Sequence, residues 1–233
     1  MARIFDNIDL PLAPHLVATY EASDRMDSAV GYFNLRGWAQ FTEAVDAKPE
    51  SPEPVMRVLV GMTLADPHDQ VQTFLQAALE GKDDPDDGID RDVARTRHQQ
   101  ALNKFRTQLM RGIPNARDLA SLRALQRHLN RGPCPDQALH SPAMHGKTYL
   151  CHREDINSPI VGFVGSSNLT MAGLKHNYEL NVDVMDFDAA AKLDTWFRAR
   201  WEDNFTIDIT ADSSRSSRSL GRRRSLAAPT RST

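Results

Sequence analysis

A histidine and a lysine separated by one residue, His145 and Lys147, are the side chains of this sequence best suited to chemistry on a phosphodiester. A neutral imidazole can attack phosphorus as a covalent nucleophile, and an ammonium group stabilises the charge that develops on the phosphoryl oxygens. If residues 145–150 form a strand, alternation places His145, Lys147 and Tyr149 on one face. The spacing therefore predicts a nucleophile and a cation side by side.

A second group of polar residues follows the next apolar run. Residues 160–164, Ile-Val-Gly-Phe-Val, read as a buried strand, and Gly165-Ser166-Ser167-Asn168 leads from it into a short helical turn closed near Gly173. Free backbone N–H groups at a helix start favour a phosphate oxygen, and the hydroxyl of Ser166 and the amide of Asn168 add donors. These residues are the predicted anion site.

Glu179 lies in a third segment, the alternating run 178–184. Alternation places it on one face of a strand, where its carboxylate could orient an imidazole. We expect Tyr149 and Tyr178 to be packing residues, with base stacking at a groove edge as the alternative.

Together, His145-x-Lys147, Gly165-Ser166-x-Asn168 and Asn177-x-Glu179 resemble one copy of the histidine-lysine signature of the phospholipase D superfamily, which includes nucleases, lipases and other phosphodiesterases. Residues 3–10 and 29–38 are similar to the phospholipase-D-like domain that precedes helicase modules in many bacterial proteins. The likeness covers most of residues 2–205.

The resemblance implies a two-step reaction that needs no metal and no cofactor, in which a histidine attacks phosphorus and water releases the resulting phosphohistidine. It implies roles for five residues, namely His145 as nucleophile, Lys147 as the clamp on a non-bridging oxygen, Ser166 and Asn168 as holders of the other oxygens, and Glu179 as the group that fixes the ring tautomer.

Two features depart from the family pattern. His152 stands where the family usually has an aspartate five positions after the lysine, and the nearest aspartate beyond it is Asp155. The chain also has a single His-x-Lys, whereas the leaving oxygen needs a proton from a second histidine. One-copy members of the family solve this by pairing two subunits, so we expect a homodimer.

Metal binding is the competing chemistry for this region. Two cysteines and three histidines fall within a short stretch, but their spacing lacks the paired close ligands of a structural zinc site. Cleavage that survives a chelator would separate the two interpretations. The five residues are Cys134, His140, His145, Cys151 and His152.

Length and composition limit the classes of protein to which this chain can belong. A chain of 233 residues with 40% hydrophobic content can bury one core, and two cysteines fit a reducing compartment. The sequence contains no apolar run long enough to span a membrane and no secretory signal at its start, which predicts a cytoplasmic protein. Although the net charge is −3, we expect a nucleic-acid substrate, DNA before RNA, rather than a phospholipid in a bilayer.

Strands alternate with helices along the chain, which predicts an α/β domain over residues 1–205, with a mixed sheet flanked by helices. An acidic loop and a helical insertion are expected at about 81–132. Residues 94–131 are basic, and they suggest either the solvent-exposed side of amphipathic helices or a surface that contacts the phosphates of a nucleic acid. Residues 206–233 are rich in Ser and Arg and are expected to be a disordered tail. Further helices are expected at 15–22, 37–45, 68–79 and 187–205, and further strands at 26–33 and 55–64.

Two functional hypotheses of different class remain open. In the first, the protein is a metal-independent phosphodiesterase, a nuclease that works alongside a helicase partner. In the second, it is a catalytically weak nucleic-acid-binding or targeting module, a truncated remnant of a helicase. Turnover that depends on His145 and Lys147 would distinguish them.

Overall fold

The computed structural model describes residues 2–51, 53–61, 103, 116–129, 137–140, 144–203 and 206–208. Within them, eight strands form one mixed sheet in the order β1-β7-β6-β5-β2-β3-β4-β8. The pairs β2–β3 and β3–β4 are parallel, and the other neighbours are antiparallel. The strands are β1 (Ile4–Phe5), β2 (Arg25–Val30), β3 (Met56–Val60), β4 (Gln137–His140), β5 (Lys147–His152), β6 (Ile160–Gly165), β7 (Asn181–Val184) and β8 (Thr206–Asp208).

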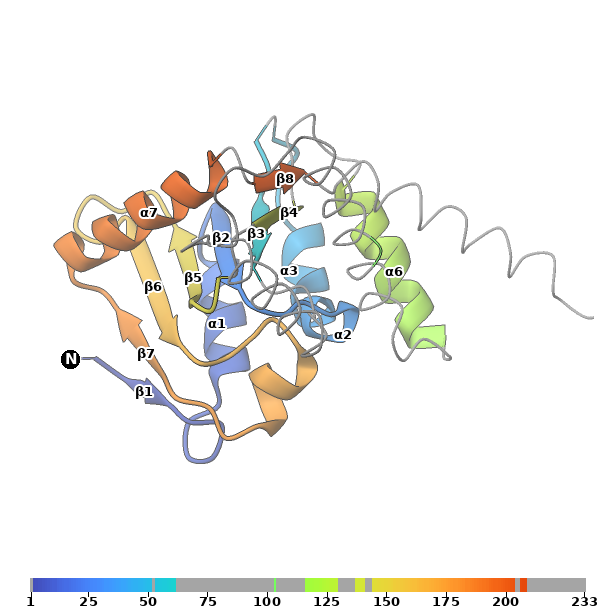
Figure 1. Cartoon of the computed structure of the whole chain (residues 1–233), viewed down its shortest axis with the longest axis horizontal. Helices are drawn as coiled ribbons and strands as arrows, with labels where there is room; N and C mark the ends of the chain where they lie inside the picture. The colour runs from blue at the N-terminus through green and yellow to red at the C-terminus, as the bar shows by residue number, and fades with distance from the viewer. Residues whose placement is uncertain are drawn as a thin grey trace, which may run out of the picture.

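Helices cover both faces of this sheet (Figure 1). Helix α7 (Phe187–Trp201) lies on one face, and the remaining helical segments lie on the other. Those segments are α1 (Leu12–Glu21), α2 (Leu35–Trp38), η1 (Ala39–Phe41), α3 (Thr42–Asp46), α6 (Ala116–Leu129) and η2 (Ala172–His176). The expected α/β class, a mixed sheet flanked by helices, is confirmed.

Alternation along the strands divides the core into two layers. In β5, Tyr149 and Cys151 face the cluster that includes α1 and α6, whereas Leu150 faces Phe197 of α7. All four side chains are at most 1% exposed. Side chains of neighbouring strand residues point to opposite faces, so one strand contributes to both layers and is buried on both sides.

Some helix boundaries differ from the sequence-based expectation. Helix α1 begins at Leu12 rather than His15, because Pro14 falls in its first turn, where a missing N–H removes no hydrogen bond. Asn7 Oδ1 accepts from the Leu12 N–H at 3.1 Å. The helix expected at 37–45 is instead the succession of α2, η1 and α3.

Strand boundaries also differ from the sequence-based expectation. The motif strand starts at Lys147 and runs to His152, so His145 precedes it, and the run expected from Tyr178 begins as a strand only at Asn181. The short edge strands β1 and β8 were not predicted, and β8 extends the sheet three residues into the expected tail. The rest of that tail and the helix expected at 68–79 lie outside the described residues.

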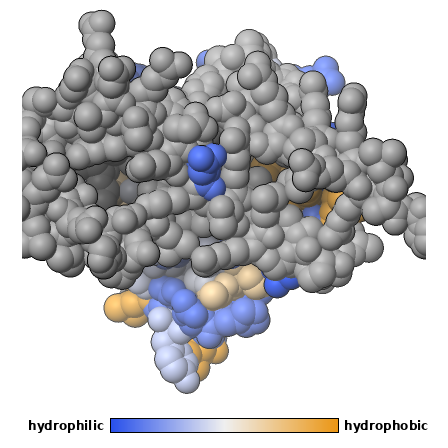
Figure 2. Space-filling view, turned by 45° about the vertical axis from the view of Figure 1, so that its right-hand side comes forward, coloured by the Kyte–Doolittle hydropathy of each residue, from blue (hydrophilic) through white to orange (hydrophobic). Residues whose placement is uncertain are grey.

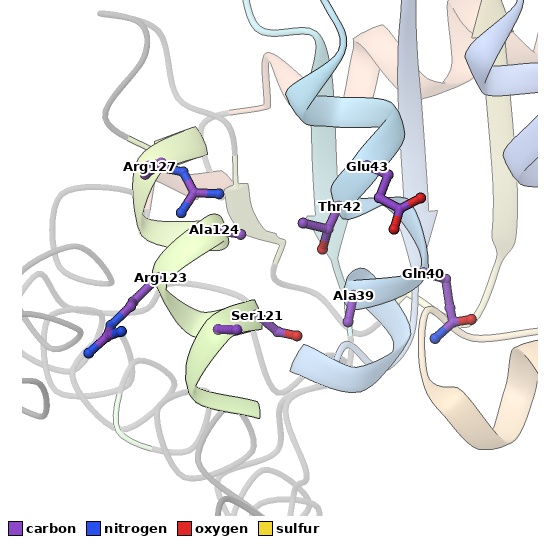
Figure 3. Close-up of a pocket in the computed structure, with 9 residues that line it drawn as sticks. Ala39, Gln40, Thr42, Glu43, Ser121, Arg123, Ala124 and Arg127 are labelled. Carbon is purple, nitrogen blue, oxygen red and sulfur yellow. The ribbon is translucent and has the colours of Figure 1, made fainter. Parts of the chain in front are cut away.

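Of the expected helical insertion, the structure describes mainly α6, whose leucines support the amphipathic interpretation. Leu122, Leu125 and Leu129 are at most 5% exposed and pack on the α1–α3 side of the core. Arg127 pairs with Asp46 of α3 at 2.9 Å. A cavity of about 610 Å³ lies between α6 and the α2–α3 segment (Figure 3), and none of the five predicted site residues lines it.

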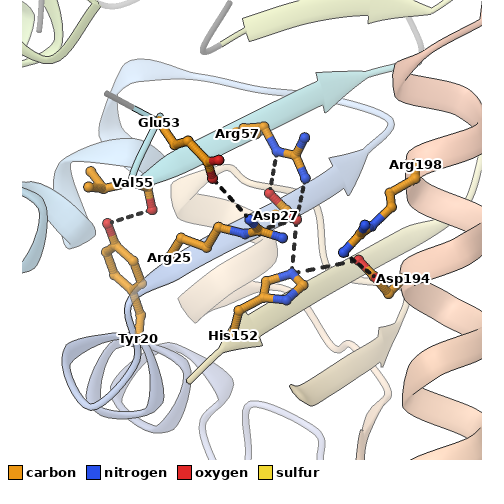
Figure 4. Close-up of polar contacts among 9 residues, drawn as sticks. All are labelled: Tyr20, Arg25, Asp27, Glu53, Val55, Arg57, His152, Asp194 and Arg198. Atoms are coloured by element: carbon orange, nitrogen blue, oxygen red, sulfur yellow. Dashed lines mark hydrogen bonds and ion pairs between the residues drawn. The ribbon is translucent and has the colours of Figure 1, made fainter. Parts of the chain in front are cut away.

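A buried ion cluster ties the sheet to α7 at the end of β5 remote from Lys147 (Figure 4). Asp27 of β2 is fully buried, and its carboxylate accepts from Arg57 Nε at 2.6 Å and Nη2 at 2.7 Å. His152 Nε2 lies 2.9 Å from Asp27 Oδ2 and 3.9 Å from Asp194 Oδ1 of α7. The Arg57 guanidinium also lies 5.1 Å from the ring centroid of Phe197. Four elements, β2, β3, β5 and α7, therefore meet in one polar cluster.

Among the described helices, none combines the length and the apolar character required to cross a membrane.

Candidate active site

His145 and Lys147 lie together at the start of β5. The Lys147 Nζ is 2.9 Å from Nδ1 and 3.2 Å from Nε2 of His145, and it donates to the His145 carbonyl oxygen at 2.8 Å. His145 is exposed, whereas Lys147 is only 5% exposed. The predicted pairing of nucleophile and cation is present, although it arises because the lysine side chain folds back over His145 and not from strand alternation.

The same strand end brings Lys147 to the predicted anion turn. Lys147 pairs with Gly165 in the register of β5 and β6, so the turn at 165–168 leaves the sheet beside it. Burial lowers the pKa of Lys147, and the negative charge of Glu179 partly opposes this effect. The strand start, the turn and Glu179 therefore belong to one electrostatic environment.

The backbone of the turn is bonded within the protein. The Ser166 N–H donates to the Leu180 carbonyl oxygen at 3.1 Å, and the Ser167 N–H donates to Asn181 Oδ1 at 3.2 Å. The Thr170 N–H donates to the Asn168 carbonyl oxygen at 2.7 Å. The expectation that these backbone groups are free to bind a phosphate is therefore wrong for Ser166 and Ser167. At Ser166 and Ser167 the backbone therefore has no free N–H for a ligand.

Two of those side chains are held in defined orientations. Asn168 Oδ1 accepts from the Tyr32 N–H at 2.9 Å, which leaves its Nδ2 as the donating end of the amide. The Ser166 hydroxyl donates to Glu179 Oε2 and accepts from the Leu180 N–H at 2.9 Å. Asn168 thus offers a fixed donor, and Ser166 links the turn to Glu179.

Glu179 has partners other than the imidazole. Its second oxygen, Oε1, accepts from Asn177 Nδ2 at 3.2 Å. Its carboxylate therefore braces the turn and acts electrostatically on Lys147, and its role in fixing the tautomer of His145 remains a prediction.

The sequence-based analysis missed the layer that holds the turn in place. The Tyr149 hydroxyl donates to the Ser167 carbonyl oxygen at 3.0 Å, and Asn181 Nδ2 donates to the Ser167 hydroxyl at 2.8 Å. All three residues are buried, and burial, reinforced by the charge of Glu179, raises the pKa of Tyr149, so its phenol keeps its proton. The alternating pattern of residues 178–184 contained the signal for this layer. Its polar face is the buried one, because Asn181 and Asp183 are both buried.

Gly165 is the position at which the turn tolerates no side chain. A Cβ there would overlap the Leu180 carbonyl oxygen. We expect Gly165→Ala to lower the free energy of unfolding by about 1–3 kcal/mol or more, because backbone atoms must move. Gly146→Ala is the control, since its Cβ would meet Trp196 at 3.5 Å, an ordinary contact. Urea denaturation of both variants checks this, and equal midpoints would contradict it.

Glu179 is expected to set the alkaline limit of activity through Lys147. Because the carboxylate opposes the lowering of the Lys147 pKa, Glu179→Gln should lower that pKa further. Because a clamp on phosphoryl oxygens requires the ammonium form, the alkaline limb of the pH–rate profile is expected to move to lower pH. Asp188→Asn, an exposed change on α7, should leave the limb in place. A Glu179→Gln limb that stays in place or moves to higher pH would contradict the coupling.

Of the five residues of the competing metal interpretation, the structure describes three side chains, and these lie in different environments. Cys151 is buried in the core, where burial raises the pKa of its thiol to about 12, whereas His145 is exposed. His152 lies in the ion cluster, where its Nε2 is within 4.8 Å of oxygens of Asp27 and Asp194. The Arg57 guanidinium already holds both oxygens of Asp27. Cys134 and the side chain of His140 lie outside the described residues.

His152, which departs from the family pattern, is also remote from the proposed chemistry. It is the last residue of β5, and Lys147 is the first. Five residues of strand span roughly 16 Å. His152 therefore belongs to the ion cluster and not to the His145–Lys147 pair.

Residues 93–201 match the family model described as "Cardiolipin synthase, PLD-like domain". This range, just under half of the chain, is similar to the PLD-like domains of the phospholipase D superfamily. The matched range contains all five predicted site residues, from His145 to Glu179. Comparison with curated proteins finds no match.

Three solved structures are similar to this chain. A phospholipase D family member, Nuc from Salmonella typhimurium, has 11% identity and a TM-score of 0.46, with coverage of 89% of this chain and 97% of Nuc. NucT from Helicobacter pylori has 12% identity and a TM-score of 0.45, with coverage of 89% and 98%. TrmBL2, an archaeal chromatin protein that binds DNA, has 12% identity and a TM-score of 0.36, with coverage of 86% and 52%.

Proposed function

We propose that this protein is a metal-independent phosphodiesterase, a nuclease that acts through a phosphohistidine on His145. The observation that carries the proposal is the contact of an exposed imidazole with the Lys147 ammonium, beside the turn that orients Asn168. Such a site offers a nucleophile and two donors to one phosphate group.

The reaction has two displacements at phosphorus. An imidazole nitrogen of His145 attacks, the bond to the leaving oxygen breaks, and that oxygen takes a proton from a general acid. Water then attacks the phosphohistidine, the N–P bond breaks, and the proton released by water returns to the same acid–base group. Lys147 and Asn168 would stabilise the charge on the non-bridging oxygens in both steps.

The acid–base group is expected from a second copy of the chain, because the sequence has a single His-x-Lys. Dimerisation should therefore be required for turnover, and specific activity should fall on dilution in step with the dimer fraction. Light scattering and rate measurements over one concentration series check this. Full activity per chain in a purely monomeric sample would contradict it.

Incubation of the purified chain with labelled DNA in the presence of a chelator tests the proposal. We expect cleavage, and we expect DNA to be cleaved in preference to a generic phosphodiester. Binding of DNA without turnover would support the alternative of a catalytically weak nucleic-acid-binding module. A helicase partner, which the similarity of residues 3–10 and 29–38 implies, is part of the proposal and would be tested by co-purification.

A further inference from the structure

The segment 175–180, which begins with the last two residues of η2 and contains Glu179, has an unusual surface. Tyr178 is 89% exposed and Leu180 is 65% exposed, contrary to the expectation that Tyr178 packs in the core. Lys175 and His176 are also exposed. Two groups that can carry positive charge thus stand beside an aromatic and an aliphatic side chain on one short stretch of chain.

The backbone of this segment is fastened at both ends. The Asn177 N–H donates to the Ala172 carbonyl oxygen at 2.8 Å, and Asn7 Nδ2 donates to the Asn177 carbonyl oxygen at 3.2 Å. At the other end, Leu180 exchanges hydrogen bonds with Ser166 at 2.9 and 3.1 Å. Tyr178 is therefore held on a fixed support, so its exposure does not come from a frayed loop.

The support is continuous with the proposed active site. Glu179, between Tyr178 and Leu180, turns its carboxylate to the Ser166 hydroxyl. Ile4 of β1, opposite Val182 in the register with β7, is a further exposed apolar side chain at 61%. The lower edge of the view in Figure 2, where Figure 1 places η2 and the loop before α1, likewise shows hydrophobic residues beside hydrophilic ones.

We infer that residues 175–180 form a binding strip for single-stranded nucleic acid, in which Tyr178 stacks an unpaired base against Leu180 and Lys175 and His176 contact backbone phosphates. The inference rests on the proposed function and specifies its substrate class. Single-strand binding sites combine cationic groups along the backbone with aromatic side chains that stack bases. In a duplex the bases already stack on one another, so they cannot cover a tyrosine on an open surface.

Equilibrium binding in a full-length His145→Ala background tests the strip without turnover. The probes are a fluorescent thymidine oligonucleotide, an abasic strand of the same length and a duplex. Tyr178→Ala should weaken binding of the oligonucleotide about tenfold to thirtyfold, whereas Tyr178→Phe, which keeps the ring, should stay within about twofold. Neither change should affect the abasic strand. Lys175→Ala should weaken binding of the oligonucleotide and of the abasic strand alike. It should also reduce the slope of log Kd against log salt concentration by about one.

Phe187→Ala is the matched control, because Phe187 is 57% exposed at the start of α7 and should leave binding unchanged. Equal loss for the oligonucleotide and the abasic strand on Tyr178→Ala would overturn base stacking. A change in oligomeric state by light scattering on Tyr178→Ala would show that the strip is a contact between copies of the chain and would also overturn the inference. Tyr178-dependent binding by a wild-type chain that never cleaves DNA would refute only the proposed nuclease activity.

Discussion

Replacing His145 with alanine is expected to reduce phosphodiester cleavage by about 10⁴-fold or more, because the attacking nitrogen is lost and no covalent intermediate can form. His145 is exposed, so the folded state should be little affected. The DNA dissociation constant should change by less than about threefold, because the contribution of the imidazole arises mainly in the transition state. Single-turnover rates and DNA affinity, measured on one preparation, check both parts.

Two comparisons isolate the effect of His145. Lys147→Ala should lower the rate by about 10²–10³-fold, the magnitude observed when one preorganised donor is removed from a reacting oxyanion. His15→Ala, a change on α1, should leave the rate unchanged. A His145→Ala variant that retains most of its rate would mean that another group attacks phosphorus, and the proposed site would be wrong.

The second large effect is expected at Asp27, where a change should affect stability. Asp27→Asn should lower the free energy of unfolding by about 3–5 kcal/mol, because it leaves the partly buried Arg57 guanidinium without its counter-ion. Asp46→Asn is the control, since Asp46 pairs with an arginine that is 58% exposed, and an exposed pair contributes at most about 1 kcal/mol. Urea denaturation at neutral pH compares them, and similar losses would contradict the importance of the buried cluster.

The same carboxylate gives stability a defined dependence on pH. Burial raises the pKa of Asp27, but the hydrogen bonds from Arg57 and His152 outweigh this effect and lower the pKa to about 2. Because folding lowers the pKa of this carboxyl group, its ionised form stabilises the fold at pH values above its unfolded pKa of 3.8. This stabilisation, about 2 kcal/mol, is lost as the pH falls towards 2. The wild type should therefore lose more stability than Asp27→Asn over this range.

Local sequence patterns predicted much of the fold because they reflect local physics. The helical spacing of Leu122, Leu125 and Leu129 identified the buried face of α6, and the apolar run at 160–164 identified β6. The pairs β1–β7 and β4–β8 were missed because short edge strands depend on partners remote in sequence. The parallel bridge between Phe33 and Leu169, which links the segment after β2 to the residue that follows the turn, has no local signal either.

The candidate site likewise has features that local sequence predicted and features that depend on residues remote in sequence. Residue type and spacing predicted that His145 and Lys147 lie together, and they are in contact because the lysine side chain folds back over His145. The bonds that occupy the Ser166 and Ser167 N–H groups come from Leu180 and Asn181, residues of another strand region, and could not be read from the turn itself. The exposure of Tyr178 was missed because β7 starts three residues later, and because Tyr178 shares its face of the alternating run with Leu180, which is 65% exposed, and not with the buried Asn181.

Rapid quenching of the reaction with single-stranded DNA in chelator, followed by peptide mass spectrometry, tests the central claim most directly. The account predicts a transient adduct of the phosphoryl-bearing DNA fragment on the imidazole of His145, labile to acid, formed before product and absent from His145→Ala. Complete turnover with no adduct at any quench time, or an adduct on a different residue, would contradict it.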